Sequence, residues 1–307
     1  MTIINTNLLS LNAQRNVANN AASLGTSINR LSTGMRVNSA KDDAAGLAIS
    51  ERMSAQSRGM EIARRNANDA VSLSQTAEGA LGSISGMLQR MRELAVQSAN
   101  ATNSTTDRTA LNNEFNQLQQ EITRTANTTR FNGNLILTQT TSFDFQIGAN
   151  ATTNDQISVS ALNVLNSSTT ASSDVGALAR VTNSSSIDIS TVGTRGSMAS
   201  SATNFATYST QTMGTGAMGA VEVLDYALAQ VNTARSTFGA VQNRFDAVIS
   251  NLNISIENQA AARSRIVDTD YARETATLAR AQVLQQAGIA MLSQANQVPN
   301  QVLSLLR

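Results

Sequence analysis

Apolar residues recur at alternating spacings of four and three near both ends of the 307-residue chain. This spacing is typical of a helix that packs along another helix at a shallow angle. Both ends are therefore predicted to be seam-forming helices, and small residues such as Gly288 would let the partner helix approach closely. The candidate seam residues are Val17, Leu24, Ile28, Leu31, Leu284, Met291, Val298, Val302 and Leu305.

Helical periodicity also continues far into the chain from both sides. It covers about 55 residues from Ala44 to Asn100, which is roughly 80 Å at 1.5 Å per residue and too long for a compact domain. Further apolar stripes run from Leu111 to Ile122 and from Leu224 to Ile256, with polar positions at Arg235 and Gln242 that suggest an assembly seam. The predicted fold class is mainly α, a long helical rod with terminal coiled-coil helices and a small β-hairpin region.

The hairpin region is predicted from a change of period in the middle of the chain. Asn132-Gly133 is a turn signal that suits positive φ, and apolar residues alternate with polar ones over 143–147 and 157–161. Residues 167–215 contain 22 Ser/Thr in 49 positions, too polar for a substantial core of their own. We expect that stretch to be a surface elaboration.

Composition excludes several classes of function. The chain has no Cys and no His, which removes thiolate chemistry, the commonest general base and the commonest metal ligand. A net charge of +1 argues against nucleic-acid binding, and no apolar run is long enough for membrane insertion. The paired acids Asp42-Asp43 and the pair Asp268 and Asp270 are interpreted as helix caps or connecting contacts. We predict no enzyme activity, no cofactor and no metal.

Several motifs resemble those of bacterial flagellins. They are Leu31-Ser32-Thr33-Gly34-Met35-Arg36-Val37-Asn38-Ser39-Ala40-Lys41-Asp42-Asp43-Ala44-Ala45-Gly46, Arg65-Asn66-Ala67-Asn68-Asp69, Gln89-Arg90-Met91-Arg92-Glu93-Leu94-Ala95-Val96-Gln97, Gly239-Ala240-Val241-Gln242-Asn243-Arg244-Phe245 and Ala295-Asn296-Gln297-Val298-Pro299. The resemblance covers about residues 1–160 and 220–307, in the family's order.

The resemblance implies a structural subunit that polymerises into the flagellar filament outside the cell for swimming motility. It implies export by the flagellar type III pathway, and as partners other copies of the chain, an export chaperone, the filament cap and hook-associated proteins. The implied segments are an N-terminal core helix and spoke (1–43), rod helices with β-hairpins (44–165), a variable Ser/Thr-rich surface segment (166–215), a C-terminal rod helix (216–257) and a C-terminal spoke and core helix (258–307).

The resemblance also points to two sets of residues that a host could recognise. Gln89, Arg90, Leu94 and Glu114 match positions read by Toll-like receptor five, and they serve equally well as packing positions of the rod. Val302, Leu303, Leu305 and Leu306 match a tail read by inflammasome sensors, although a role in the terminal seam explains them without a host.

Two alternatives to a filament subunit stay open from the sequence. A hook–filament junction protein of the same family would share the terminal pattern. A non-flagellar coiled-coil adaptor or adhesin would also have helical seams, but it would not need the motifs between the seams and the rod.

Overall fold

The computed structural model describes residues 7–160, 162–164, 181, 189–191 and 216–304, without the side chains of residues 298–304. The described residues form five α-helices and two short antiparallel strand pairs, which confirms the predicted mainly α fold class with a small β-hairpin region. The chain divides into two compact units. Unit 1 comprises residues 1–58 and 255–307, and unit 2 comprises residues 59–254.

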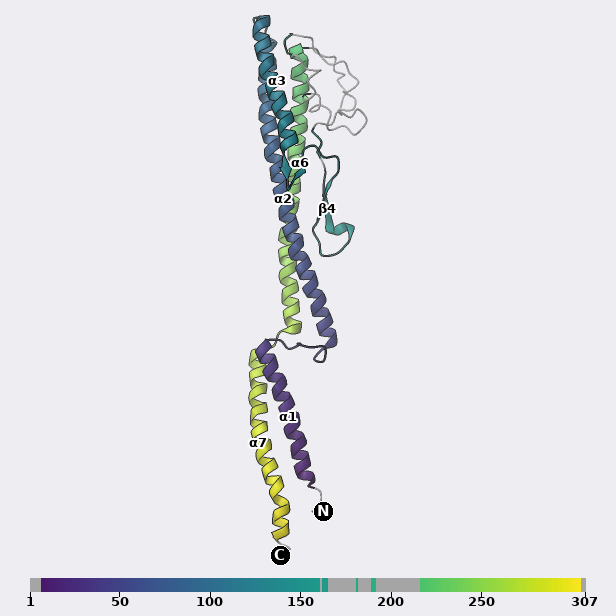
Figure 1. Ribbon diagram of the computed structural model, residues 1–307, viewed down its shortest axis with the longest axis vertical. Helices are drawn as coiled ribbons and strands as arrows, with labels where there is room; N and C mark the ends of the chain where they lie inside the picture. Colours follow the sequence, from purple (N-terminus) through teal and green to yellow (C-terminus); the bar gives the residue numbers. More distant parts are fainter. Residues whose placement is uncertain (1–6, 161, 165–180, 182–188, 192–215, 305–307) are drawn as a thin grey trace. The chain divides into compact units, whose positions relative to one another are not determined.

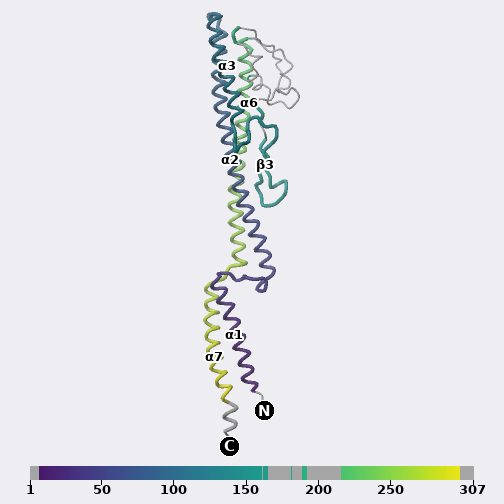
Figure 2. Tube along the Cα trace, viewed as in Figure 1, coloured from purple at the N-terminus to yellow at the C-terminus, as the bar shows by residue number. Residues whose placement is uncertain are grey.

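Unit 1 contains two helices that lie side by side although they come from opposite ends of the sequence (Figure 1 and Figure 2). Helix α1 spans Leu8–Thr33 and helix α7 spans Tyr271–Ser304. The side-chain oxygen of Asn7 accepts a hydrogen bond from the Ser10 N–H and caps the start of α1. Gly34 ends α1 with a φ of 70°, a left-handed conformation that glycine adopts without a Cβ penalty. Local sequence therefore sets both ends of α1.

The segments next to these helices are joined by backbone hydrogen bonds. The Arg36 N–H donates to the Val267 carbonyl at 2.6 Å, and the Thr269 N–H donates to the Gly34 carbonyl at 3.0 Å. The Asp270 carboxylate accepts from the backbone N–H groups at the start of α7, which confirms the predicted cap there. Backbone contacts, rather than apolar packing alone, thus connect the two ends of the chain in unit 1.

The two acids before the second helix have separate roles. Helix α2 spans Ala44–Ser98, and the Asp43 carboxylate accepts from the Gly46 N–H at 2.8 Å, so Asp43 is the predicted cap. Asp42 instead closes the preceding turn by accepting from the Ser39 hydroxyl and from the N–H groups of Ser39 and Asn38, and these bonds lower its pKa. The paired acids are therefore structural.

Unit 2 is built on residues of α2, of α3 (Thr105–Thr128) and of α6 (Gly216–Val267), which share one apolar core. The 55 residues of α2 confirm the single long helix predicted from residue 44 to about 100. The largest fully buried side chains of the three helices are Leu81, Ile84, Leu88, Met91, Leu94, Phe115, Ile122, Leu224 and Phe245. Unit 2 thus places its larger apolar side chains inward.

Two strand pairs pack against this core. Strands β1 (Arg130–Phe131) and β2 (Asn134–Leu135) are joined by the predicted Asn132-Gly133 turn, with φ values of 48° and 82°. Strands β3 (Phe143–Gln146) and β4 (Gln156–Val159) pair antiparallel, and the 3₁₀ turn η1 (Thr153–Asp155) lies in their connection. This hairpin is held at the core by an edge-to-face contact of Phe145 with Phe245 of α6, at 5.8 Å between ring centroids.

The Ser/Thr-rich stretch contributes to the core at two of its described residues, which the sequence did not predict. Val181 and Ile189 are both fully buried. The Gln119 side chain donates to the Val181 carbonyl, and the Ser98 hydroxyl donates to the Ile189 carbonyl. The prediction that segment 166–215 is purely peripheral is therefore wrong at Val181 and Ile189, because these two apolar side chains are buried in the core.

The polar positions of the α6 stripe also have partners within the chain. Gln242 donates to the Glu78 carboxylate of α2 at 3.0 Å, and Arg235 lies 3.9 Å from the same carboxylate. Arg235 and Gln242 therefore take part in the packing of α6 on α2, and their place in an assembly seam stays a prediction.

Candidate assembly surface

Helices α1 and α7 run antiparallel along each other. At one end the Asn7 side chain donates to the Ala295 carbonyl at 2.8 Å, and at the other the Tyr271 hydroxyl donates to the Leu31 carbonyl at 3.3 Å. Beside the first of these contacts, the Ser10 hydroxyl donates to the Asn296 side chain. Polar contacts at both ends therefore fix the register of the pair.

Small residues line the contact between the two helices. Ser10, Ser27 and Ala281 are exposed by only 7%, 3% and 7%. At Gly288, an added Cβ would lie 2.8 Å from a methyl group of Val17, too close for an ordinary contact. The absence of a side chain at Gly288 therefore allows the close approach that the sequence predicted.

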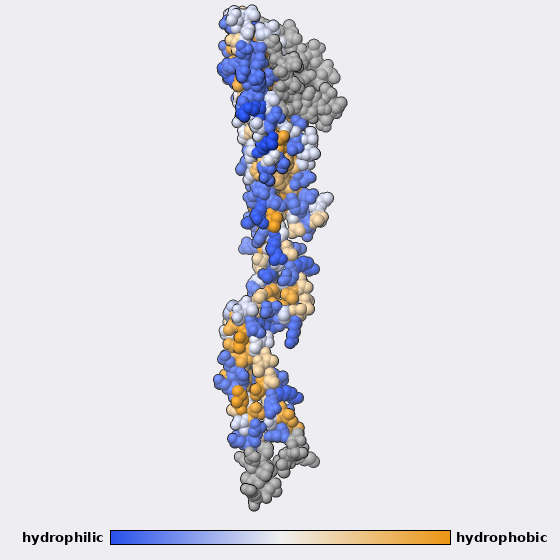
Figure 3. Space-filling view, viewed as in Figure 1, coloured by the Kyte–Doolittle hydropathy of each residue, from blue (hydrophilic) through white to orange (hydrophobic). Residues whose placement is uncertain are grey.

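Eight larger apolar side chains of the pair are exposed to solvent. Figure 3 shows apolar residues gathered on the visible face of α1 and α7. We call the exposed aliphatic and methionine side chains of the two helices the outward row, and their exposed fractions range from 46% to 67%. The outward row comprises Leu8, Leu9, Leu11, Ile28, Val283, Leu284, Ile289 and Met291. A helix pair with small residues inside and larger apolar residues outside presents an apolar surface to solvent.

The predicted seam residues divide between these two environments. Val17, Leu24 and Leu31 are partly buried in unit 1. Ile28, Leu284 and Met291 are exposed by 49%, 46% and 67% and belong to the outward row. The side chains of Val298, Val302 and Leu303 lie outside the described residues, as do the whole of Leu305 and Leu306.

Sequence reasoning missed five members of the outward row. Leu8, Leu9 and Leu11 precede the run that defined the N-terminal seam, and Val283 and Ile289 lie between the heptad positions of the C-terminal one. The available signal was the apolar character of these helices outside the a and d positions, which exceeds what a two-helix seam needs.

The four predicted receptor-contact residues do not share one surface. Gln89, Arg90 and Glu114 are exposed, and the Arg90 guanidinium donates to the Glu114 carboxylate at 2.9 Å. Hydrogen bonds from Arg90 to Glu114 and then to Glu93 raise the pKa of Arg90 above its usual value. Leu94 is fully buried, because it lies on the face of α2 that packs into the core. Leu94 is therefore not exposed beside the other three residues.

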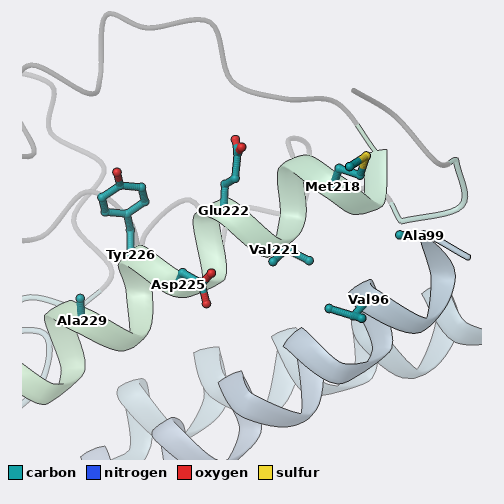
Figure 4. Close-up of a pocket in the computed structure, with 8 residues that line it drawn as sticks. All are labelled: Val96, Ala99, Met218, Val221, Glu222, Asp225, Tyr226 and Ala229. Atoms are coloured by element: carbon teal, nitrogen blue, oxygen red, sulfur yellow. The ribbon is translucent and has the colours of Figure 1, made fainter. Parts of the chain in front are cut away.

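Unit 2 also has an open cavity of about 480 Å³ where the end of α2 meets the start of α6 (Figure 4). Val221 and Asp225 point from α6 towards α2, where Arg92 donates to Asp225 at 2.5 Å, and Val96 lies across from them. Glu222 and Tyr226 point to the other side of α6. The cavity is mainly apolar and brings together no set of acid, base and nucleophile.

Within the residues that the structure describes, no cluster of three or more acidic, His or Cys residues could hold a metal ion. No helix in the described part of the chain is long and apolar enough to cross a membrane.

An antiparallel pair of terminal helices with an outward apolar row is the geometry of a protein that assembles through helix packing. The comparisons with known proteins identify the family. Residues 4–142 match the bacterial flagellin N-terminal helical region, and residues 221–306 match the bacterial flagellin C-terminal helical region.

Two curated relatives match over nearly their whole length. The chain is 42% identical to a flagellin of Halalkalibacterium halodurans over 99% of this chain and 100% of the relative. It is 39% identical to a flagellin of Bacillus subtilis over 99% of both chains. The crystal structure of Bacillus cereus flagellin is 31% identical, with a TM-score of 0.42 over 65% of this chain and 94% of that one.

The chain belongs to the bacterial flagellin family. It is a structural subunit of the bacterial flagellar filament, it polymerises with copies of itself, and it is not an enzyme. Its place is therefore the filament, outside the cell.

Proposed function

We propose that the outward row of α1 and α7 is the surface through which copies of the chain pack in the filament. The exposed fractions of the eight side chains, 46% to 67%, carry the proposal. Burying a large apolar side chain completely stabilises an assembly by about 1.5–3 kcal/mol, so the row can supply much of the driving force. The partly buried seam residues Val17, Leu24 and Leu31 hold α1 and α7 together beneath it.

The remaining seam residues extend this surface in the proposal. Val298, Val302 and Leu305 continue the heptad spacing beyond Met291 towards the C-terminus. In the filament, segments 1–43 and 258–307 would form the core and its spoke, and segments 44–165 and 216–257 would form the rod. Packing by a rotation that does not close on itself produces an open helical polymer.

Delivery and assembly factors are part of the same proposal. Membership of the flagellin family supports export by the flagellar type III pathway, with an export chaperone, and growth beneath a filament cap after the hook-associated proteins. The lack of Cys is compatible with passage through a narrow channel as an unfolded chain, because no disulfide can form before export.

Recognition by a host is a separate proposal for the free chain. The exposed residues Gln89, Arg90 and Glu114 lie within reach of a partner such as Toll-like receptor five, and the Arg90–Glu114 ion pair fixes two of them. The C-terminal residues Val302, Leu303, Leu305 and Leu306 are proposed as a tail for inflammasome sensors, from their apolar sequence.

Seeded growth tests the assembly surface. Filaments are dissociated by heat, short fragments are added as seeds, and elongation by purified monomer is measured by negative-stain electron microscopy. Replacing Leu284 and Met291 by Asp puts two charges into the outward row, and we expect filament growth to be lost. The matched control replaces Leu284 by Ile and Met291 by Leu, keeps the row apolar, and is expected to elongate.

Thermal unfolding of the monomer separates assembly from folding. Because Leu284 and Met291 are exposed, the Asp variant should unfold at the temperature of the unchanged chain. Filament growth of the Asp variant at the normal rate would refute the proposed surface.

A further inference from the structure

Met291 is the most exposed member of the outward row, at 67%. Seven of the ten methionines fall within the described residues: Met35, Met53, Met60, Met87, Met91, Met218 and Met291. Of these seven, only Met291 is exposed, and the other six are buried or partly buried. An oxidant in solution therefore reaches the sulfur of Met291 more readily than the sulfur of the other described methionines.

The composition directs two-electron oxidation to methionine. The chain contains no Cys, no Trp and no His, so no thiol, indole or imidazole competes for the oxidant. Oxidation of a methionine converts a flexible apolar thioether into a polar sulfoxide and disrupts methionine-containing interfaces.

We propose that Met291 is an oxidative modification site that controls the entry of the free chain into the filament. A hydroperoxide oxidises the thioether: the sulfur lone pair attacks one peroxide oxygen, the O–O bond breaks and an S–O bond forms. For hydrogen peroxide the other oxygen leaves as water, so sulfur loses two electrons and the peroxide gains them. The sulfoxide then places an unpartnered acceptor in the outward row, which opposes burial against another copy.

This inference rests on the proposed packing role of the outward row, and it has a direct consequence. In the free chain Met291 is open to the oxidant, whereas in the filament a neighbouring copy would cover it. The same residue is therefore vulnerable before assembly and protected after it. Chains that are oxidised at Met291 before assembly are therefore kept out of the filament, whereas Met291 in assembled filaments is protected from oxidation.

The test treats free chain and intact filaments with the same low concentration of hydrogen peroxide. Peptide mass spectrometry follows oxidation at each methionine, with the fully buried Met91 as the internal reference. Met291 in the free chain is expected to oxidise at least about tenfold faster than Met91, and at least about tenfold faster than Met291 in filaments. Seeded elongation of treated chain should fall in proportion to the sulfoxide at Met291.

Two variants assign the effect to this residue. Met291→Leu should elongate as well after peroxide treatment as before it, because it has no thioether at this position. Met291→Gln, which places a polar side chain there without an oxidant, should elongate poorly. Methionine sulfoxide reductase should restore elongation of the treated unchanged chain.

Defined outcomes overturn the inference. Normal elongation by chain that is fully oxidised at Met291 would contradict it, and so would equal peroxide sensitivity of Met291→Leu and the unchanged chain. A separate result, elongation by the variant with Asp at both Leu284 and Met291, would refute the proposed assembly surface. If that variant is inactive while the oxidised chain elongates, the surface stands and only the oxidation inference falls.

Discussion

The two units of the chain use their apolar residues in opposite ways. Unit 2 buries its largest apolar side chains, among them Phe115 and Phe245. The α1–α7 pair of unit 1 buries small residues and exposes large ones such as Leu284 and Met291. Packing of an amphipathic face supplies most of the stability of helices in proteins. Unit 2 therefore contains its own core, and the exposed apolar side chains of the helix pair support the proposal that other copies of the chain complete it.

We expect the largest loss of stability from a substitution in the core of unit 2. Phe245→Ala removes a fully buried ring that contacts Phe145, and we expect the free energy of unfolding of the monomer to fall by about 3–5 kcal/mol. Leu284→Ala in the outward row is the matched control and should change it by less than about 0.5 kcal/mol. Denaturant unfolding followed by circular dichroism measures both. Equal losses would contradict the division between the two units.

A smaller loss should follow from the two core residues supplied by the Ser/Thr-rich stretch. Ile189→Ala is expected to reduce the free energy of unfolding by about 2–4 kcal/mol, because a fully buried side chain leaves a cavity. The control is Asn113→Ala on α3, an exposed position. If Ile189→Ala unfolds like the control, this residue is peripheral, as the polar sequence around it had suggested.

The contact between α1 and α7 offers a test by paired substitutions. Gly288→Ala adds a Cβ 2.8 Å from Val17, and overpacking of this kind costs about 1–3 kcal/mol, part of which is offset by the about 1 kcal/mol better helix propensity of Ala. We expect filaments of this variant to dissociate at a lower temperature, measured by light scattering during heating. Val17→Ala in the same chain should restore much of the loss. No recovery in the double variant would show that Gly288 does not set the helix approach.

The smallest effect concerns pH and the cap of α3 in unit 2. Hydrogen bonds from the Ser104 hydroxyl and N–H lower the pKa of Asp107 below its usual value. Because the folded-state pKa is the lower one, the contribution of Asp107 to stability is present above about pH 4 and is lost as the pH falls through the folded-state pKa. Asp107→Ala should therefore lower the melting temperature at pH 7, and the difference should shrink at pH 3. A difference independent of pH would refute this role.

Most of the fold could be predicted because its elements carry local signals. Helical periodicity predicted α2 from Ala44, and the Asn132-Gly133 pair predicted a turn. The acids before the helices predicted their caps. The core positions of Val181 and Ile189 could not be predicted, since isolated apolar residues in a polar stretch have no period. Their burial depends on where the chain returns to the core.

The candidate surface was predicted only in outline. The heptad spacing of the C-terminal helix identified Gly288, Leu284 and Met291 as one seam, but it could not separate the side that meets α1 from the side that faces outward. That division depends on the register of α7 against α1. For the same reason the burial of Leu94 was missed, because a motif does not show which face of a helix packs into the core.

Hydrogen–deuterium exchange of the free chain and of the filament tests whether other copies complete the terminal helix pair, because it measures protection of each helix before and after assembly. We expect peptides from α1 and α7 to gain strong protection in the filament, whereas the core peptides of unit 2 around Leu81 and Phe245 should already be protected in the free chain. Equal protection of α1 and α7 in both states would contradict the claim that other copies of the chain complete the terminal helix pair.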